Sequence, residues 1–79
     1  MDEIQIGSQF KSNSYHTAEL SEFGTRRLQK GTVVKCVAIE GETRLTFEIV
    51  TCCVSLFVGQ TFTIETTSDG FRKFEPVQD

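Results

Sequence analysis

The sequence predicts an all-β domain, a small five-stranded antiparallel barrel of the SH3-like or OB-like type. Three observations predict it. Apolar and polar residues alternate in four runs, turns that contain glycine separate these runs, and seven Phe can fill a small core. The runs cover residues 32–40, 43–50, 61–67 and 71–77. The turn signals are Glu40-Gly41-Glu42, Val58-Gly59-Gln60 and Ser68-Asp69-Gly70.

The chain length of 79 residues allows one domain, residues 1–79, with one core. A chain this short buries only about 60–65% of the surface that its unfolded form exposes, so its stability is small. A homodimer is one way for such a domain to bury more surface, and it stays open as an alternative.

The N-terminal third predicts one strand and one short helix. Apolar residues alternate with polar ones over residues 4–11, which predicts the first strand, and Ser12-Asn13-Ser14 ends it. Residues 17–23 predict one or two helical turns, because Thr17 can cap the start and Gly24 can end the helix. A turn over residues 21–29 is an overlapping alternative.

The middle runs predict the core of the sheet. Residues 32–39 are apolar on both faces, which is typical of a central strand that is covered on two sides. In the next run, Leu45, Phe47 and Ile49 predict an inner face, and Phe62 and Ile64 repeat the pattern. A bend is expected within residues 51–57, since one strand over 43–57 would exceed the usual length of about 5–6 residues.

The last run predicts a hairpin and an edge strand. Asp69-Gly70 is typical of a two-residue type I′ turn, which would pair Ser68 with Phe71 and bring Arg72 and Lys73 opposite Glu65 or threonines. Pro76 cannot donate a ladder hydrogen bond, so this strand is an edge or ends there. The alternative architecture is an open antiparallel sheet with one helix packed on a face.

Charge and cysteine content disfavour several classes of protein. The net charge is −3, which disfavours binding to duplex DNA or to an anionic membrane. The acidic N-terminus lacks the basic residues of a secretory signal, and no apolar run reaches the ~18 residues of a membrane span, so a soluble, cytoplasmic protein is expected.

The cysteines Cys36, Cys52 and Cys53 lack metal-ligand spacing, and His16 is the single histidine. We expect reduced and mostly buried thiols, no metal and no cofactor. A disulfide from Cys36 to Cys52 or Cys53 stays open. A thiol enzyme that uses His16 lacks an identifiable third group, so no enzymatic activity is expected.

Two groups of residues are candidates for binding. Basic residues with neighbouring aromatic rings suggest a platform for single-stranded nucleic acid, in which arginines meet phosphates and rings stack on bases. The simpler interpretation of the same residues is a solvated loop whose charges offset Glu19 and Glu22. The platform would use Tyr15, Phe23, Arg26, Arg27, Lys30 and Lys35, with Lys11 nearby.

The second candidate is the apolar segment 51–57. If Leu56 and Phe57 point outward, they form an exposed patch typical of a protein interface. If they point inward, they close one end of the barrel, which is the slightly favoured alternative.

Three segments, residues 4–10, 31–34 and 71–77, resemble those of very small SH3-like barrel proteins encoded by phages and other mobile elements. The resemblance implies a barrel and an accessory role, and it supplies no functional residues. Residues 12–30 and Cys52-Cys53 depart from the pattern.

Taken together, the net charge, the lack of a catalytic constellation and the apolar segment 51–57 predict a non-enzymatic binding module that docks onto a protein partner. Single-stranded nucleic-acid binding is the alternative.

Overall fold

A computed structural model describes residues 4–77 and contains seven strands and two short 3₁₀ helices. Strands make up 51% of the described residues, so the all-β prediction is confirmed. The number of strands is larger than the five predicted. The elements are β1 (Gln9–Ser12), β2 (His16–Leu20), β3 (Gly24–Leu28), β4 (Val33–Glu40), β5 (Arg44–Thr51), η1 (Ser55–Phe57), β6 (Thr61–Glu65), η2 (Asp69–Lys73) and β7 (Phe74–Pro76).

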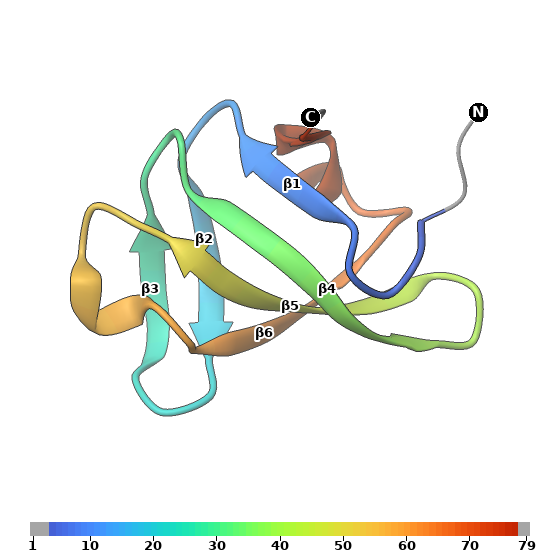
Figure 1. Ribbon diagram of the computed structural model, residues 1–79, viewed down its shortest axis with the longest axis horizontal. Coiled ribbons are helices and arrows are strands. Elements are labelled where there is room, and N and C mark those ends of the chain that lie inside the picture. Colours follow the sequence, from blue (N-terminus) through green and yellow to red (C-terminus); the bar gives the residue numbers. More distant parts are fainter. Residues whose placement is uncertain (1–3, 78–79) are drawn as a thin grey trace.

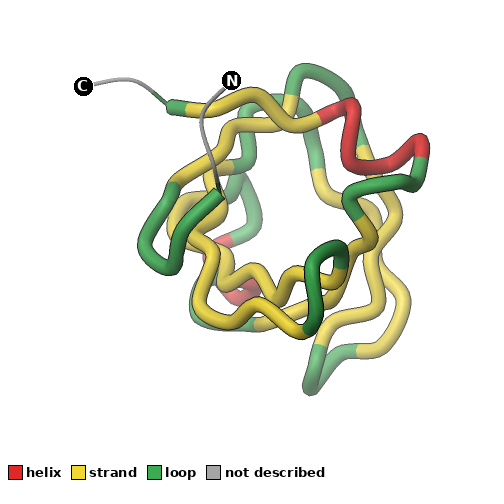
Figure 2. Tube along the Cα trace, turned by 90° about the vertical axis from the view of Figure 1, so that its right-hand side faces the viewer, coloured by secondary structure: helices red, strands yellow, loops and turns green. Residues whose placement is uncertain are grey.

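The strands form two antiparallel sheets around one interior. Five strands pair in the order β6-β5-β4-β1-β7, and β2 and β3 form a separate hairpin (Figure 1). Viewed from the side, the chain curls around a common interior (Figure 2). The buried side chains of the core occupy this interior. The N–H of Ser21, in the β2–β3 turn, donates to the Thr61 carbonyl at 3.0 Å, which joins the hairpin to the start of β6. The core therefore lies between the curved sheet and the hairpin.

The β4–β5 hairpin confirms the predicted alternation. Leu45, Phe47 and Ile49 of β5 are buried, and Gly41 makes the turn with a φ of 62°. The cover of β4 is complete on one face only, because Val34 is buried whereas Lys35 and its alternate neighbours are half-buried. The prediction of cover on both sides of this strand is therefore wrong.

Phenylalanine rings fill the centre of the core. The Phe47 ring lies 5.3 Å from that of Phe10, 5.7 Å from that of Phe62 and 5.6 Å from that of Phe74, measured between centroids. Phe71 of η2 packs on Phe10 at 5.9 Å. These contacts join β1, β5, β6 and β7, so the aromatic cluster connects the two edges of the five-stranded sheet.

The prediction of a helix near residues 17–24 is wrong, because this segment is strand β2 and its turn. Burial alternates with a period of two: Ala18 and Leu20 are buried, while Thr17 and Glu19 are exposed. Gly24, with a φ of 69°, opens β3 instead of ending a helix. Only the first part of the alternative turn over 21–29 is a turn, since residues 24–28 form the second strand.

The first strand is shorter than predicted and begins at Gln9 rather than at residue 4. Gly7 has a φ of 98° and makes a turn, and Ile6 is 68% exposed instead of facing the core. The strand includes Ser12 and so ends one residue later than predicted. The Ser12 side chain is buried, and its hydroxyl donates to the Gln29 carbonyl and accepts from the Thr32 N–H.

The predicted Asp69-Gly70 hairpin is wrong, because β6 and β7 lie at opposite edges of the five-stranded sheet. The chain crosses between these edges through η2, and the Phe71 N–H donates to the Ser68 carbonyl in a turn. β7 pairs with β1 instead and ends at Pro76, which confirms the prediction of an edge strand.

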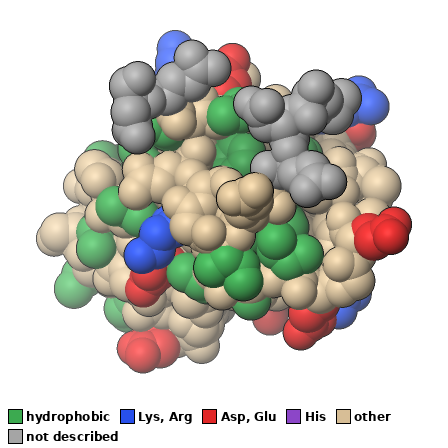
Figure 3. Space-filling view, turned by 45° about the vertical axis from the view of Figure 1, so that its right-hand side comes forward, with side chains coloured by type: hydrophobic (Ala, Val, Ile, Leu, Met, Phe, Trp, Pro, Cys, Tyr) green, Lys and Arg blue, Asp and Glu red, His purple; other side chains and the backbone are tan. Residues whose placement is uncertain are grey.

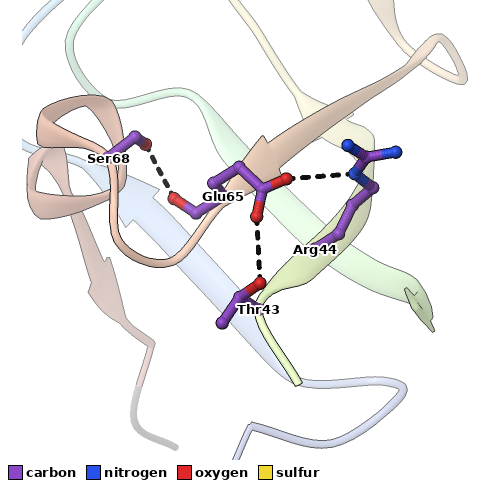
Figure 4. Close-up of polar contacts among 4 residues, drawn as sticks. All are labelled: Thr43, Arg44, Glu65 and Ser68. Atoms are coloured by element: carbon purple, nitrogen blue, oxygen red, sulfur yellow. Dashed lines mark hydrogen bonds and ion pairs between the residues drawn. The ribbon is translucent and has the colours of Figure 1, made fainter. Parts of the chain in front are cut away.

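The expected pairing of Arg72 or Lys73 with Glu65 is also wrong. The Glu65 carboxylate accepts from Arg44 Nε at 3.1 Å and from Thr43 Oγ1 at 3.0 Å, and the Ser68 hydroxyl donates to the Glu65 carbonyl (Figure 4). The hydrogen bonds that the carboxylate accepts, first from Arg44 and then from Thr43, lower the pKa of Glu65. Arg72 instead lies 3.9 Å from Asp69 within η2.

Candidate functional site

The segment between β5 and β6 carries an exposed apolar surface. It bends after Thr51 as predicted, and η1 turns the chain back to Gly59, which has a φ of 91°. The main chain is held in place, since the Gly59 N–H donates to the Ile49 carbonyl at 2.8 Å. We name the η1 surface after this helix, and its exposed members are Val50, Cys53, Val54, Leu56 and Val58.

Leu56 and Phe57 point in different directions. Leu56 is 71% exposed, so the favoured inward orientation is wrong for this residue. Phe57 is half-buried, and its ring lies 5.7 Å from that of Phe23 in the β2–β3 turn. The β2–β3 hairpin therefore packs against η1 through the contact of Phe23 with Phe57.

The η1 surface is free of charge. No charged residue occurs between Glu48 and Glu65, although charged residues make up 24% of the chain. Within this segment the apolar side chains alternate with Thr, Ser, Gly and Gln rather than with charged residues, and depletion of charge is typical of the centre of a protein interface.

The face drawn in Figure 3 shows how charge is distributed on that side of the molecule. Hydrophobic side chains reach the surface in several places, and the charged side chains are dispersed rather than gathered into one basic area. A broad basic face, which duplex binding needs, is not seen on this side.

The structure separates the residues of the predicted nucleic-acid platform. Tyr15 precedes β2 and Phe23 follows it, so the two residues flank opposite ends of a five-residue strand that is about 17 Å long at roughly 3.3 Å per residue. Lys35 lies 3.8 Å from Glu48 on the outer face of the sheet. The exposed Arg26 donates to the Thr25 carbonyl. Phe23 and Lys35 therefore do not join Tyr15 in one site.

Two cations lie beside Tyr15, and one of them was not expected. The Arg27 guanidinium carbon lies 4.9 Å from the centre of the Tyr15 ring, and Lys73 Nζ lies 5.9 Å from it. Arg27 is across from Thr17 in the hairpin register, which brings it next to Tyr15 on the outer face. Local sequence patterns could not place Lys73 beside Tyr15, because η2 brings it there from the far end of the chain.

Lys30 lies in the loop before β4, which is hydrogen-bonded to the end of β1. The Gly31 N–H donates to the Ser12 carbonyl at 2.9 Å, and the Thr32 hydroxyl donates to the Gln29 carbonyl at 2.7 Å. An open cavity of about 450 Å³ lies between this loop and the end of β1, and it is lined by Lys11, Ser12, Asn13, Lys30, Gly31 and Glu75.

The histidine and the cysteines lie in different environments. His16 is half-buried, with its ring 5.5 Å from that of Phe74, and burial followed by the charge of Lys73 lowers the pKa of His16. Cys36 is buried, and burial raises the pKa of its thiol, so it is protonated at neutral pH. All three cysteines are free, so the alternative disulfide is absent, and Cys53 is exposed rather than buried.

Two structural features are absent from residues 4–77. Within this part of the chain, no group of three or more His, Cys, Asp or Glu side chains is arranged to hold a metal ion. The helices described there are too short to cross a membrane.

Comparison of the chain with protein-family models, with curated proteins and with solved structures found no match in any of the three. The resemblance to small phage-encoded barrels therefore stays a prediction.

Proposed function

We propose that the protein is a small, non-enzymatic binding module that docks onto a protein partner through the η1 surface. The observation that carries the proposal is the exposure of Leu56 at the centre of an uncharged apolar segment that Phe57 and Phe23 support. A side chain of this size at the surface gains free energy when a partner covers it, at about 25 cal/mol per Å² of apolar area.

The partner that fits is a neutral or basic protein with an apolar recess. Two copies of this chain carry a net charge of −3 each and repel one another, which favours a different protein over a homodimer. The exposed side chains of the η1 surface amount to a few hundred Å², less than the roughly 800 Å² per partner of a stable interface. They would therefore form the energetic centre of a contact whose rim comes from neighbouring elements.

We propose in addition that the two sheets form one small barrel. An SH3-like or OB-like barrel is supported by the hydrogen bond between Ser21 and Thr61, which brings the hairpin against β6, and by the curl of the sheet in Figure 2. An accessory role in the cytoplasm, on a host or viral protein, follows from the resemblance to phage-encoded barrels.

The test compares two matched substitutions, Leu56→Asp and Ile6→Asp. Both replace an exposed aliphatic side chain by a carboxylate, at 71% and 68% exposure, and only the first lies in the η1 surface. A photo-crosslinking residue at position 56, with position 6 as control, first identifies the partner in the native cell. Titration of the purified partner then measures affinity.

We expect Leu56→Asp to weaken binding of that partner by about tenfold or more, and Ile6→Asp to leave it unchanged. Equal affinity of the Leu56→Asp variant and the wild type would overturn the proposal. So would a stable dimer in light scattering that Leu56→Asp dissociates, because the surface would then bind a second copy.

A further inference from the structure

Basic side chains without an acidic partner gather around the loop between β1 and β2. Of the eight Lys and Arg residues, three pair with carboxylates, namely Lys35, Arg44 and Arg72. Within residues 4–77, the other five have no carboxylate within 4.0 Å. Four of these five surround residues 12–15, and they are Lys11, Arg27, Lys30 and Lys73.

The loop connects the two halves of this group. On one side, Asn13 lines the cavity of about 450 Å³ together with Lys11 and Lys30. On the other side, the Asn13 N–H donates to the Lys73 carbonyl at 2.7 Å, which brings η2 against the loop. Two residues later, Tyr15 lies beside Arg27 and Lys73. The four cations therefore follow one continuous stretch of chain.

One carboxylate, that of Glu75, lies in the cavity wall. Its Oε1 accepts from Asn13 Nδ2 at 3.3 Å, so it is directed to the loop amide. The balance of charge around the loop remains positive in a molecule whose net charge is −3. Such a local excess of positive charge attracts an anion.

The exposed ring of Tyr15 distinguishes the kinds of anion. The residue is 56% exposed even with two cations beside it, so part of the ring is open to a planar group. An acidic peptide would use the cations and would leave the ring unused. A nucleic-acid strand uses both, since its phosphates contact cations and its bases stack on aromatic rings.

We propose that Tyr15, Arg27, Lys73, Lys11 and Lys30 form a binding site for single-stranded nucleic acid along the β1–β2 loop. A single strand is favoured over a duplex because the ring can only stack on a base that is unpaired. The site is separate from the η1 surface, and it does not depend on the protein partner.

The test measures the anisotropy of fluorescein-labelled oligothymidine and oligouridine of roughly 12 nucleotides during titration with the full-length protein. If all four cations contact phosphates, log K falls with log[salt] with a slope of about −2.8, so raising the salt from about 50 to 200 mM weakens binding about 50-fold. A duplex of the same length is expected to bind more weakly.

Two variants separate the ring from the charges. Tyr15→Ala is expected to weaken binding about 10- to 100-fold with little change in the salt slope. Lys73→Ala is expected to reduce the slope by about 0.7. The matched control is Arg72→Ala, which removes the same charge from the preceding residue. Arg72 is paired with Asp69 and lies outside the proposed site. Circular dichroism confirms that each variant is folded.

Three results would overturn the proposal: no binding of either oligonucleotide at about 50 mM salt, equal losses in Lys73→Ala and Arg72→Ala, or a labelled glutamate-rich peptide that binds as tightly as the oligonucleotides with no effect of Tyr15→Ala. Leu56→Asp is expected to bind the oligonucleotides like the wild type, so failure of this proposal and failure of protein docking are distinguishable.

Discussion

The two hairpins of this protein are built in different ways. In β4–β5 the inner residues of β5 are large and buried, and its neighbours β4 and β6 pair along most of its length. In β2–β3 only a few inner residues, Ala18, Leu20 and Leu28, are buried, and four of the five residues of β3 are exposed. The first hairpin forms the core, whereas the second depends on the core for its position and leaves its outer face free for binding.

The largest expected effect concerns the core side of this comparison. Phe47→Ala removes a ring that contacts Phe10, Phe62 and Phe74, and it leaves a cavity that strands cannot close. The free energy of unfolding should fall by about 3–5 kcal/mol, which leaves a protein of this size largely unfolded. Urea denaturation followed by circular dichroism measures it. A loss below about 1 kcal/mol would contradict the assignment of this ring to the centre of the core.

The next prediction tests the contact between His16, the first residue of β2, and Gly70 of η2. A Cβ added at Gly70 would lie 2.6 Å from His16 Cε1, and the His16 ring packs against Phe62 and Phe74 and cannot move freely. Gly70→Ala should therefore cost about 1–3 kcal/mol of stability.

His16→Ala supplies the matching cycle for this contact. In the His16→Ala background the same Gly70→Ala change should cost much less, because the clash is gone. Equal costs in both backgrounds would show that η2 does not pack on this histidine.

A smaller and more local effect concerns the turn end of the same hairpin. The side-chain oxygen of the buried Gln60 accepts from the Ser21 hydroxyl and from the Glu22 N–H, both at 2.9 Å. Gln60→Ala leaves these donors without that partner and should cost about 1 kcal/mol. Hydrogen exchange should be faster in β2–β3 and unchanged in β4–β5. Equal acceleration in both hairpins would contradict a local role of Gln60 in attaching the β2–β3 hairpin to the core.

The smallest effect is a pH dependence that comes from His16. Its pKa lies below the ordinary value of 6.5 in the folded protein, because burial and then the charge of Lys73 disfavour the imidazolium. The unfolded chain binds the proton more readily, so stability is retained above pH 6.5 and is lost as the pH falls through that value. The lowered pKa of Glu65 acts in a separate window, below its ordinary value of 4.5.

Urea unfolding at about pH 7.5 and 5.5 measures the histidine effect. The wild type should be less stable at the lower pH, and His16→Gln should reduce the difference. If the stability of the His16→Gln variant changes with pH as much as that of the wild type, groups other than His16 cause the pH dependence.

The comparison also explains what the sequence could predict. In β4–β5 and β6 the alternation of Leu45, Phe47 and Ile49 with polar residues is local, so it was sufficient to predict strands and inner faces. In β2 the same alternation uses small or polar residues, and Leu20 and Phe23 at a spacing of three suggested a helix instead. Strand formation there depends on pairing with β3 and on packing against the core.

The candidate sites show the same limit. The uncharged segment around Leu56 is visible in the sequence, but its exposure depends on how η1 packs on Phe23. Lys73 and Tyr15 meet only because η2 crosses from β6 to β7, and Asp69-Gly70 suggested a hairpin in place of that crossing. Contacts that depend on a crossover cannot be predicted from local patterns.

Both proposed surfaces depend on the β2–β3 hairpin, since Phe23 in its turn supports Phe57 and its register brings Arg27 next to Tyr15. A nitrogen-edited NOESY spectrum tests this pairing most directly. We predict cross-strand contacts that join Thr17 with Arg27 and Glu19 with Thr25, as the antiparallel register requires. Strong sequential amide contacts over residues 17–23, with contacts between residues three apart, would indicate a helix and would contradict the account of both surfaces.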